Sequence, residues 1–297
     1  MAKVAIELEH ALARRRRDGT PGRTVPHVIA RGEGWTVADV LCTCGPQDCP
    51  YEERHTHDTI AIVCAGSFEY RSPVGGALMT SGSLMLGNHG HGFECGHRHG
   101  EGDRCVSFWY TPEYFERLVS DAGTRRRGAG LNVPRLPPMR DLSPLVARVA
   151  AAVVDADRRA TMPWEEMAVR LAGRTVRLAA GMTPEPHTLP LNAEARVTSI
   201  VRAIDRHPDD RLSLEQLARQ ARLSPYHFLR TFERLTGITP HQYVLRVRLR
   251  EAASRLLDGA DKVLEVALDC GFGDVSNFNR AFRTEFGMSP RAFRASR

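Results

Sequence analysis

The chain has 297 residues, of which 42% are hydrophobic and 26% are charged, enough for one large domain or two modest ones. This composition excludes a wholly disordered chain. The uncharged run 74–93 contains Gly, Ser, Asn and His throughout, so we predict no membrane span. Near the N-terminus, Glu7 and Glu9 interrupt the apolar stretch and arginines follow it, the reverse order for a secretion signal. We therefore expect a cytoplasmic protein whose seven cysteines are thiols or metal ligands rather than disulfides.

The net charge of +6 is concentrated at one end of the chain. Residues 193–297 carry 18 Lys and Arg residues against 13 Asp and Glu residues, whereas residues 1–192 carry 23 against 22. A basic C-terminal third indicates that this part of the chain has a polyanionic partner.

The first 24 residues are predicted to form a solvated tail, and a strand-rich region follows over 25–123. In that region, short alternating runs recur about every ten residues and are separated by turns that contain glycine. The runs are 35–41, 59–63, 67–71, 83–86 and 105–110. This spacing is typical of a small antiparallel barrel or sandwich.

Residues 124–191 are predicted to form a linker and a pair of helices. The segment 124–140 is rich in Arg, Gly and Pro, and helices are expected over 143–159 and 163–181, each with a proline in its first turn. They should form an antiparallel hairpin whose apolar faces need a partner, either the barrel or a second subunit. We predict that this hairpin makes the protein a homodimer.

The remaining residues, 192–297, are predicted to be helical, with clear start signals. Ser213 with Gln216 and Thr239 with Gln242 have the spacing of capping boxes. Three further pairs place a hydroxyl at the N-cap and proline at the first helical position: Ser224-Pro225, Thr239-Pro240 and Ser289-Pro290.

The same region repeats itself after 50 residues. Phe228, Arg230, Phe232, Gly237 and Pro240 recur as Phe278, Arg280, Phe282, Gly287 and Pro290. Each copy predicts two helices joined by a short turn, over 214–221 and 225–235 and then over 263–269 and 275–285. The phenylalanines at i and i+4 form a buried stripe beside an arginine, as a helix that reads a DNA groove requires.

A single helix predicted over 240–257 separates the two copies. Its length is about 27 Å at about 1.5 Å per residue, a little less than the ~34 Å helical repeat of duplex DNA. One rigid spacer of this length can place both units in successive major grooves.

With these motifs, residues 195–297 resemble the DNA-binding domain of the AraC/XylS family of bacterial transcription regulators, and 266–290 is similar to the family's signature almost without a gap. The resemblance implies two helix-turn-helix units on a shared linker helix. Arginine suits guanine and asparagine suits adenine at base edges. Carried over by position, the base-edge candidates are Tyr226, Leu229, Arg230, Val275, Ser276, Asn277, Asn279 and Arg280. Arg222 stands at a turn position where glycine is frequent, which predicts strain in the first turn.

The strand-rich region resembles the cupin-type sensor barrel that precedes such domains. Gly82, Asn88 and Gly90 resemble the second cupin motif, but Phe93 stands where its metal-binding histidine belongs. His55-x-His57 resembles the first motif, without the carboxylate that should follow. Because an iron or manganese cupin enzyme needs that ligand set, we predict that the protein is not an enzyme.

A denser group of cysteines and histidines occurs in the same region. Cys95, His97 and His99 alternate, so on a strand they would share one face, and Cys105 follows after a predicted turn. The predicted ligands are Cys95, His97, His99, Cys105 and His55, with Cys42 in reserve. Thiolate with imidazole favours Zn²⁺, and Cu(I) or another thiophilic ion also fits. The same thiols are also candidates for redox sensing or for small core residues.

Together these features predict an α+β protein with a cupin-like β-barrel, a helical hairpin and an all-α double helix-turn-helix domain. The predicted function is a transcription regulator that binds double-stranded DNA in the nucleoid and responds to a small molecule or metal in its barrel. The resemblance implies activation through contact with RNA polymerase. Two alternatives remain: a cupin-type oxygenase or isomerase fused to a DNA-binding module, and a regulator whose zinc is purely structural.

Overall fold

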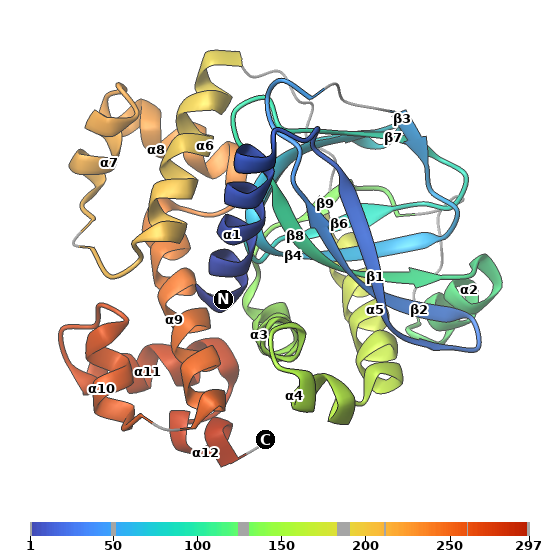
Figure 1. Ribbon diagram of the computed structural model, residues 1–297. Coiled ribbons are helices and arrows are strands. Elements are labelled where there is room, and N and C mark those ends of the chain that lie inside the picture. The colour runs from blue at the N-terminus through green and yellow to red at the C-terminus, as the bar shows by residue number, and fades with distance from the viewer. Residues whose placement is uncertain are drawn as a thin grey trace.

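The computed structural model describes residues 2–48, 52–123, 131–182, 191–210, 212–259 and 261–295. Within these ranges the protein is α+β, with an antiparallel sheet in the N-terminal part and a helical C-terminal part beside it (Figure 1). The strands are β1 (Thr24–Gly32), β2 (Trp35–Cys42), β3 (Glu52–Arg54), β4 (Asp58–Ser72), β5 (Gly75–Thr80), β6 (Leu84–Gly87), β7 (Gly92–Gly96), β8 (Asp103–Tyr110) and β9 (Arg135–Leu136).

Helices cover part of this sheet and make up the described C-terminal part (Figure 1). In the N-terminal two thirds they are α1 (Ala2–Asp18), α2 (Pro112–Asp121), the 3-10 turn η1 (Arg140–Leu142), α3 (Ser143–Val153), α4 (Ala156–Thr161) and α5 (Trp164–Ala180). The C-terminal helices are α6 (Leu191–Arg206), α7 (Leu214–Gln220), α8 (Pro225–Thr236), α9 (Pro240–Asp258), α10 (Val263–Asp269), α11 (Val275–Phe286) and α12 (Pro290–Ala295). In the part of the chain that is described, none of them combines the length and apolar character needed to cross a bilayer.

The long strand β4 organises the sheet. The strand order is β1-β2-β8-β4-β6-β9, and β5 and β7 also pair with β4. The two strands predicted over 59–63 and 67–71 are in fact one. Gly66, at a φ of 78°, does not end the strand, and the pairing with β8 shifts register between Val63 and Ala65. A bulge of this kind bends a strand without breaking it, so β4 changes partners from β6 to β5 and β7 along its length.

Side chains alternate between two cores along β4. Ile60 and Ile62 belong to the larger core, which α1, α2, α3 and α5 complete. Ala61 and Val63 face the opposite way, into a smaller core with Phe68 and Tyr70. Period-two alternation with both faces buried explains why nearly the whole strand is inaccessible.

The N-terminus is a helix rather than the predicted tail. Helix α1 buries Val4, Leu8, Ala11 and Leu12, the i, i+4, i+7 and i+8 positions of one face, against β4 and β8. It lies between the sheet and the C-terminal helices (Figure 1). The prediction of a tail was wrong because the charged residues on the outer face of α1 obscure this short apolar stripe.

A buried arginine fastens α1 to the sheet. The Arg104 guanidinium donates to both carboxylate oxygens of Asp39, at 2.9 and 2.7 Å, and also to Glu7 of α1. Arg104 is 7% exposed, so these carboxylates must compensate the free-energy cost of burying its positive charge. Because Arg104 points to this side of β8, its neighbours Asp103 and Cys105 point to the other.

In place of the predicted two-helix hairpin, the chain forms three helices, α3, α4 and α5, and α3 and α5 pack against different elements. The first predicted helix ends at Val153, and Asp155 caps α4 by accepting from the backbone of Asp157 and Arg158. Helix α3 is buried almost all round, because the sheet lies on one side and α9 and α11 on the other. Helix α5 packs on α2 and β2. The chain itself therefore covers the apolar faces, and dimerisation through them stays a prediction.

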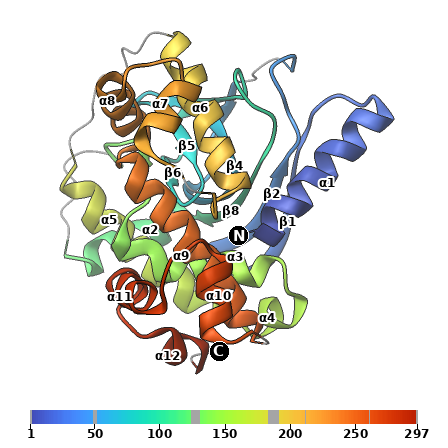
Figure 2. The same cartoon turned by 90° about the vertical axis from the view of Figure 1, so that its left-hand side faces the viewer.

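The C-terminal helices begin and end close to the predicted residues. Both capping boxes are present, from Ser213 to Gln216 and from Thr239 to Gln242. The Ser224 side chain accepts from the His227 backbone, while Asp274 caps α11 by accepting from Asn277 at 2.7 Å. The four stripe phenylalanines Phe228, Phe232, Phe278 and Phe282 are fully buried. The two units lie at opposite ends of α9 (Figure 2).

The turn in the first unit carries the expected strain. Among the described residues, Arg222 is the non-glycine residue with a positive φ, at 54°. The second unit has Gly271 at its turn, with a φ of 82°. Because a left-handed conformation forces Cβ close to a carbonyl oxygen, glycine adopts it at much lower cost.

Removing the acid that pairs with Arg104 should destabilise the protein strongly. We expect Asp39→Ala to lower the free energy of unfolding by about 3 kcal/mol, because a buried guanidinium loses its bidentate partner. The check is urea unfolding followed by circular dichroism. The control Arg16→Ala removes an exposed ion pair with Glu101 and should cost less than about 1 kcal/mol. Equal effects of the two substitutions would contradict the assignment.

The strained turn gives an expectation of the opposite sign. Arg222→Gly should raise the free energy of unfolding by about 1 kcal/mol, since glycine relieves the left-handed strain. The matched substitution Arg219→Gly, within helix α7, should instead lower it by about 0.5–1 kcal/mol. Loss of stability in both variants, measured by the same urea unfolding, would show that the turn is not strained.

Candidate DNA-binding surface and candidate metal centre

The second helix of each unit presents its polar residues to solvent. Tyr226 is 63% exposed, and Arg230, Ser276, Asn277, Asn279 and Arg280 are also exposed, whereas Leu229 and Val275 are half-buried. Since Phe228 and Phe278 anchor the opposite faces, the polar faces of α8 and α11 are fixed in orientation. These are the base-edge candidates that the family resemblance implies, and base contact by each of them stays a prediction.

Each second helix also orders its arginine. The Arg230 guanidinium donates to the Tyr226 hydroxyl at 3.2 Å and lies 5.8 Å from the centre of the Tyr226 ring. In α11, Arg280 donates to the Asn277 side-chain oxygen at 3.2 Å. Contacts at i, i+4 and i, i+3 restrict these long side chains before any partner arrives.

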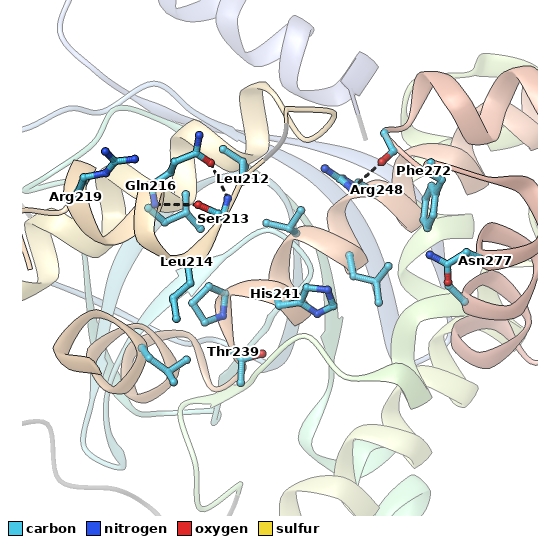
Figure 3. A pocket seen from close by; sticks show the side chains of 18 residues that line it. Leu212, Ser213, Leu214, Gln216, Arg219, Thr239, His241, Arg248, Phe272 and Asn277 are labelled. Atoms are coloured by element: carbon cyan, nitrogen blue, oxygen red, sulfur yellow. Dashed lines mark hydrogen bonds between the residues drawn. The ribbon is translucent and has the colours of Figure 1, made fainter. Parts of the chain in front are cut away.

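A hollow of about 1050 Å³ lies between the two units (Figure 3). Its walls include Leu229 of α8 and Asn277 of α11, and Thr239 and His241 of α9 contribute to its lining. Both second helices therefore border one concave surface.

Arg248 of α9 fixes the two units relative to each other. Its guanidinium donates to the carbonyl of Pro208 at 2.6 Å and to that of Asp210 at 2.8 Å, both in the loop between α6 and α7. The same side chain donates to the carbonyl of Gly271, in the turn of the second unit, at 2.8 Å (Figure 3). One side chain thus ties both units to the helix between them.

In the sheet domain, three buried side chains that could each bind a metal ion lie close together. One donor atom from each of Cys42, His97 and Asp103 lies within 4.8 Å of the others, and this is the group of three or more that the described residues contain. Cys42 and Asp103 are direct cross-strand neighbours of β2 and β8, and His97 follows β7. These residues could bind a metal ion, because a thiolate, an imidazole and a carboxylate are all zinc ligands.

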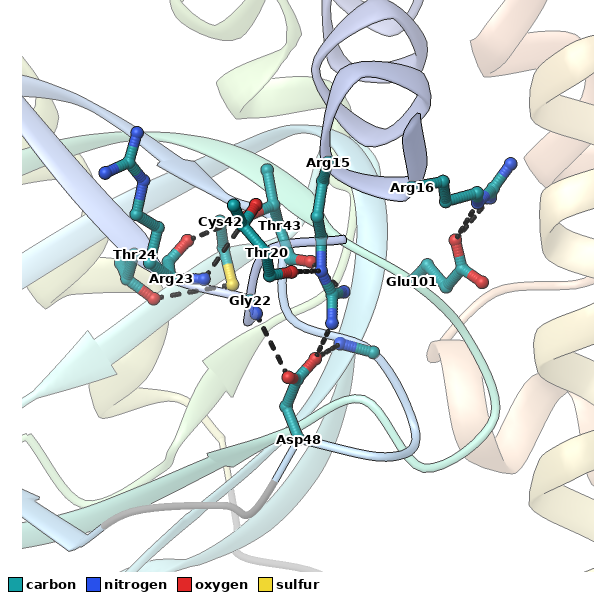
Figure 4. Close-up of polar contacts among 11 residues, drawn as sticks. Arg15, Arg16, Thr20, Gly22, Arg23, Thr24, Cys42, Thr43, Asp48 and Glu101 are labelled. Atoms are coloured by element: carbon teal, nitrogen blue, oxygen red, sulfur yellow. Dashed lines mark hydrogen bonds and ion pairs between the residues drawn. The ribbon is translucent and has the colours of Figure 1, made fainter. Parts of the chain in front are cut away.

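His97 and Asp103 of this group are hydrogen-bonded to each other, and neighbouring side chains are hydrogen-bonded to Asp103 and Cys42. His97 Nε2 and Asp103 Oδ2 are 2.8 Å apart, and the Cys105 thiol donates to Asp103 Oδ1 at 3.2 Å. Thr24 donates to Cys42 Sγ at 3.4 Å (Figure 4). Burial raises the pKa of the Cys42 thiol, and the negative charge of Asp103 raises it further. Burial also raises the pKa of Cys44, which follows Cys42 by two residues.

This group differs from the predicted ligands. Of Cys95, His97, His99, Cys105 and His55, His97 alone belongs to it. The reason is that β7 ends at Gly96, so Cys95, His97 and His99 do not alternate along one strand as expected. Cys105 lies next to the group through Asp103, and the reserve residue Cys42 belongs to it. Asp103 was missed because its Gly-rich surroundings favour a turn, although Asp103 and Cys105, two residues apart on a strand, share a face.

His55 serves the core of the sheet domain. Its ring stacks on Phe93 at 4.0 Å between centroids, and its Nε2 lies 2.9 Å from the Tyr70 hydroxyl. Burial lowers the pKa of His55 to about 4. His57 has other neighbours, Thr56 and the Trp109 ring. Phe93 therefore occupies space beside His55, and the two histidines of the first cupin-like motif do not share partners.

Residues of the second cupin-like motif form hydrogen bonds with other segments of the sheet domain. Asn88 donates to the Leu131 carbonyl at 2.9 Å and accepts from the Leu131 backbone N–H at 2.6 Å, which secures the chain where the described residues resume after 124–130. The Gly90 N–H donates to the His55 carbonyl. Of the remaining cysteines of the sheet domain, Cys49 lies outside the described residues.

Comparison with known proteins shows similarities of the C-terminal part. Residues 217–296 match the family model described as a helix-turn-helix domain. The chain is 36% identical over 106 residues to the HTH-type transcriptional activator RhaS of Escherichia fergusonii, a match that covers 36% of this chain and 38% of RhaS. The chain thus spans less than half the length of that relative.

Two solved structures are also similar to the chain. The DNA-binding domain of AdpA, in complex with a target DNA, is 35% identical and covers 34% of this chain and 91% of that one, with a TM-score of 0.32. ToxT from Vibrio cholerae O395 is 13% identical and covers 89% of this chain and 98% of that one, with a TM-score of 0.36. Residues 217–296 are thus similar to helix-turn-helix domains.

Proposed function

We propose that the protein is a DNA-binding transcription regulator that activates its target genes in response to an effector bound by the sheet domain. The observation that carries this proposal is the duplicated helix-turn-helix unit, with two buried phenylalanine stripes and exposed polar faces on α8 and α11. Residues 217–296, which match the helix-turn-helix family, include both of these helices. Activation is inferred from the name of RhaS, a transcriptional activator, to which this region is 36% identical.

The spacing of the units supports binding to one face of a duplex. Helix α9 has 19 residues, which corresponds to about 28 Å at about 1.5 Å per residue. This is close to the ~34 Å that separates successive major grooves on one face of DNA. We therefore propose an asymmetric operator with two short elements about one helical turn apart, each read by one second helix.

The sheet domain is placed to influence the DNA-binding units. Leu78 of β5 belongs to the hydrophobic core of the first unit, and Ala147 and Ala151 of α3 belong to that of the second. Arg135 donates to the Leu78 carbonyl and also to the Leu235 carbonyl at the end of α8. A change in the sheet domain can therefore reach both units through packed contacts. The finer description of this domain as a cupin-type sensor barrel, dimerisation and contact with RNA polymerase stay predictions from the sequence.

Substitution of a reading arginine should change sequence preference as well as affinity. The operator is first obtained by selecting tight binders from randomised duplexes with the purified chain. On that duplex, Arg280→Ala should weaken binding by ~1–3 kcal/mol and relax the preference at one base pair. Arg230→Ala should do the same at a position about one turn away. Arg170→Ala, in α5, removes the same charge and should leave both quantities unchanged. Unaltered sequence preference in both reading variants would contradict the base contacts.

The rigid spacer gives an expectation on the DNA side. Inserting 5 base pairs between the two elements should turn one element to the opposite face and weaken binding more than about tenfold. Inserting a full turn should weaken binding as much, since α9 cannot lengthen. Gel-shift titration of the three duplexes measures this. If the full-turn insertion restores affinity, the two units are flexibly joined and the proposed geometry is wrong.

A further inference from the structure

The loop between β7 and β8, residues 97–102, joins the candidate metal centre to the DNA-binding domain. His97 begins this loop, and Asp103 follows it directly. Between them, Arg202 of α6 donates to the Glu101 carbonyl, and a Cβ added to Gly100 would lie 2.9 Å from the Arg202 guanidinium carbon. Helix α6 contributes Val197, Ile200, Val201 and Ile204 to the core of the first helix-turn-helix unit. The loop therefore touches the metal centre at its ends and the DNA-binding domain in its middle.

Two further contacts hold the middle of the loop. Arg98 Nε lies 3.5 Å from a carboxylate oxygen of the buried Glu69 of β4. His99 Nε2 and Glu69 Oε1 are 3.9 Å apart, and neither atom has a hydrogen-bond partner among the described residues. A slightly different position of the loop would let these two atoms form a hydrogen bond.

Helix α1 holds the loop and the neighbouring segment 43–48 from the other side. Arg16 pairs with the Glu101 carboxylate, and Arg15 pairs with Asp48 at 2.6 Å and donates to the Thr43 carbonyl (Figure 4). Asp48 also accepts from the backbone of Gly22 and Gly45. The C-terminal end of α1 thus contacts both segments that carry the metal ligands. One is the segment after Cys42, and the other is the loop between His97 and Asp103.

In the present structure, the donor atoms of His97 and Asp103 are hydrogen-bonded to each other. A zinc ion lies about 2.0–2.3 Å from each of its ligands, so a set whose members are within 4.8 Å needs only small movements to surround one. Binding would replace the His97–Asp103 hydrogen bond, because both atoms would then face the ion. Cys44 follows Cys42 by two residues and is not one of the three residues within 4.8 Å of one another, so it would have to move toward them to serve as a fourth ligand. A set of two sulfurs, one nitrogen and one oxygen favours Zn²⁺ over hard cations such as Mg²⁺.

We propose that Cys42, Cys44, His97 and Asp103 form a site for a thiophilic divalent cation of the zinc type, and that loop 97–102 transmits its occupancy to α6. This proposal rests on the proposed function, since it identifies the effector of that regulator. Occupancy moves both ends of a short loop whose middle contacts Arg202, so the two states of the loop differ in their contacts with the DNA-binding domain. Differential contact of this kind is what couples an effector site to a DNA site.

The site is tested first by metal stoichiometry. The purified full chain is stripped with a chelator, given excess Zn²⁺, dialysed and subjected to elemental analysis. We expect one zinc per chain in the wild type and well below one per chain in Cys42→Ser and in His97→Ala, because each variant lacks a ligand. The control variants Cys95→Ser and His99→Ala should keep their zinc. Retention of zinc by Cys42→Ser, or its loss in Cys95→Ser, would overturn the ligand set.

A second measurement guards against variants that fail to fold. Circular dichroism shows whether each variant keeps the wild-type content of helix and strand. In the folded wild type, Co²⁺ in place of Zn²⁺ should give a thiolate-to-metal absorption band, and this band should be weakened in Cys44→Ser, which leaves three ligands. A band of unchanged intensity in Cys44→Ser would remove Cys44 from the site.

The coupling is tested with the selected operator duplex. Wild-type affinity for this duplex should differ at least about fivefold between zinc-loaded and stripped protein. Arg202→Ala should bind zinc normally yet lose most of this difference, because the contact between loop and α6 is gone. Arg206→Ala removes the same charge from the same helix and should keep the difference.

The outcomes separate the two proposals. Equal DNA affinity of loaded and stripped wild type would overturn the coupling, and unfolding on chelation would identify a structural zinc scaffold instead. If no duplex is selected at all, the proposed function fails, whereas the zinc stoichiometry still decides the metal site.

Discussion

The arrangement of the C-terminal part depends on one constraint, namely that a single helix takes part in two hydrophobic cores. The first half of α9 supplies Tyr243, Val244 and Val247 to the core of the first unit. Its second half supplies Leu249, Ala252, Ala253, Leu256 and Leu257 to the core of the second. Because the helix is continuous, neither unit can rotate or move along it without exposing apolar surface. The distance and angle between α8 and α11 follow from this sharing, and Arg248 reinforces it from the side that faces the hollow.

The same helix also joins the DNA-binding units to the sheet domain. Arg250 is buried and donates to the Ser81 carbonyl at 3.1 Å, in the turn between β5 and β6. Asp205 of α6 accepts from the Ser81 hydroxyl at 2.9 Å and from the Tyr243 hydroxyl at 3.0 Å. Separating the domains would leave these buried polar groups without partners, which is costly unless water replaces them. The units are therefore held in one orientation by the sheet domain, and the proposed effector would act against this junction.

The candidate metal centre lies within reach of this junction, although it uses none of the same residues. Loop 97–102 contacts α6 at Arg202, one turn of helix before Arg206, while Ser81 contacts it at Asp205. Two separate parts of the sheet domain thus contact α6 of the first unit. Movement of the loop would change the contact at Arg202 and leave the contact at Asp205 in place. This favours a small change in the orientation of α6 over complete release of the DNA-binding domain.

Local sequence determined most of the C-terminal part. Caps such as Ser213 with Gln216, and stripes such as Phe228 with Phe232, act within a few residues, so the helix boundaries and the exposed faces of α8 and α11 could be predicted. The strained turn at Arg222 was predictable for the same reason. Tertiary structure alone decided the rest. Helix α1 exists because β4 and β8 offer an apolar surface, and β4 is one strand because a bulge replaces the expected turn at Gly66. Cys42, His97 and Asp103 meet because strand pairing brings distant residues together, and no spacing along the chain records that register.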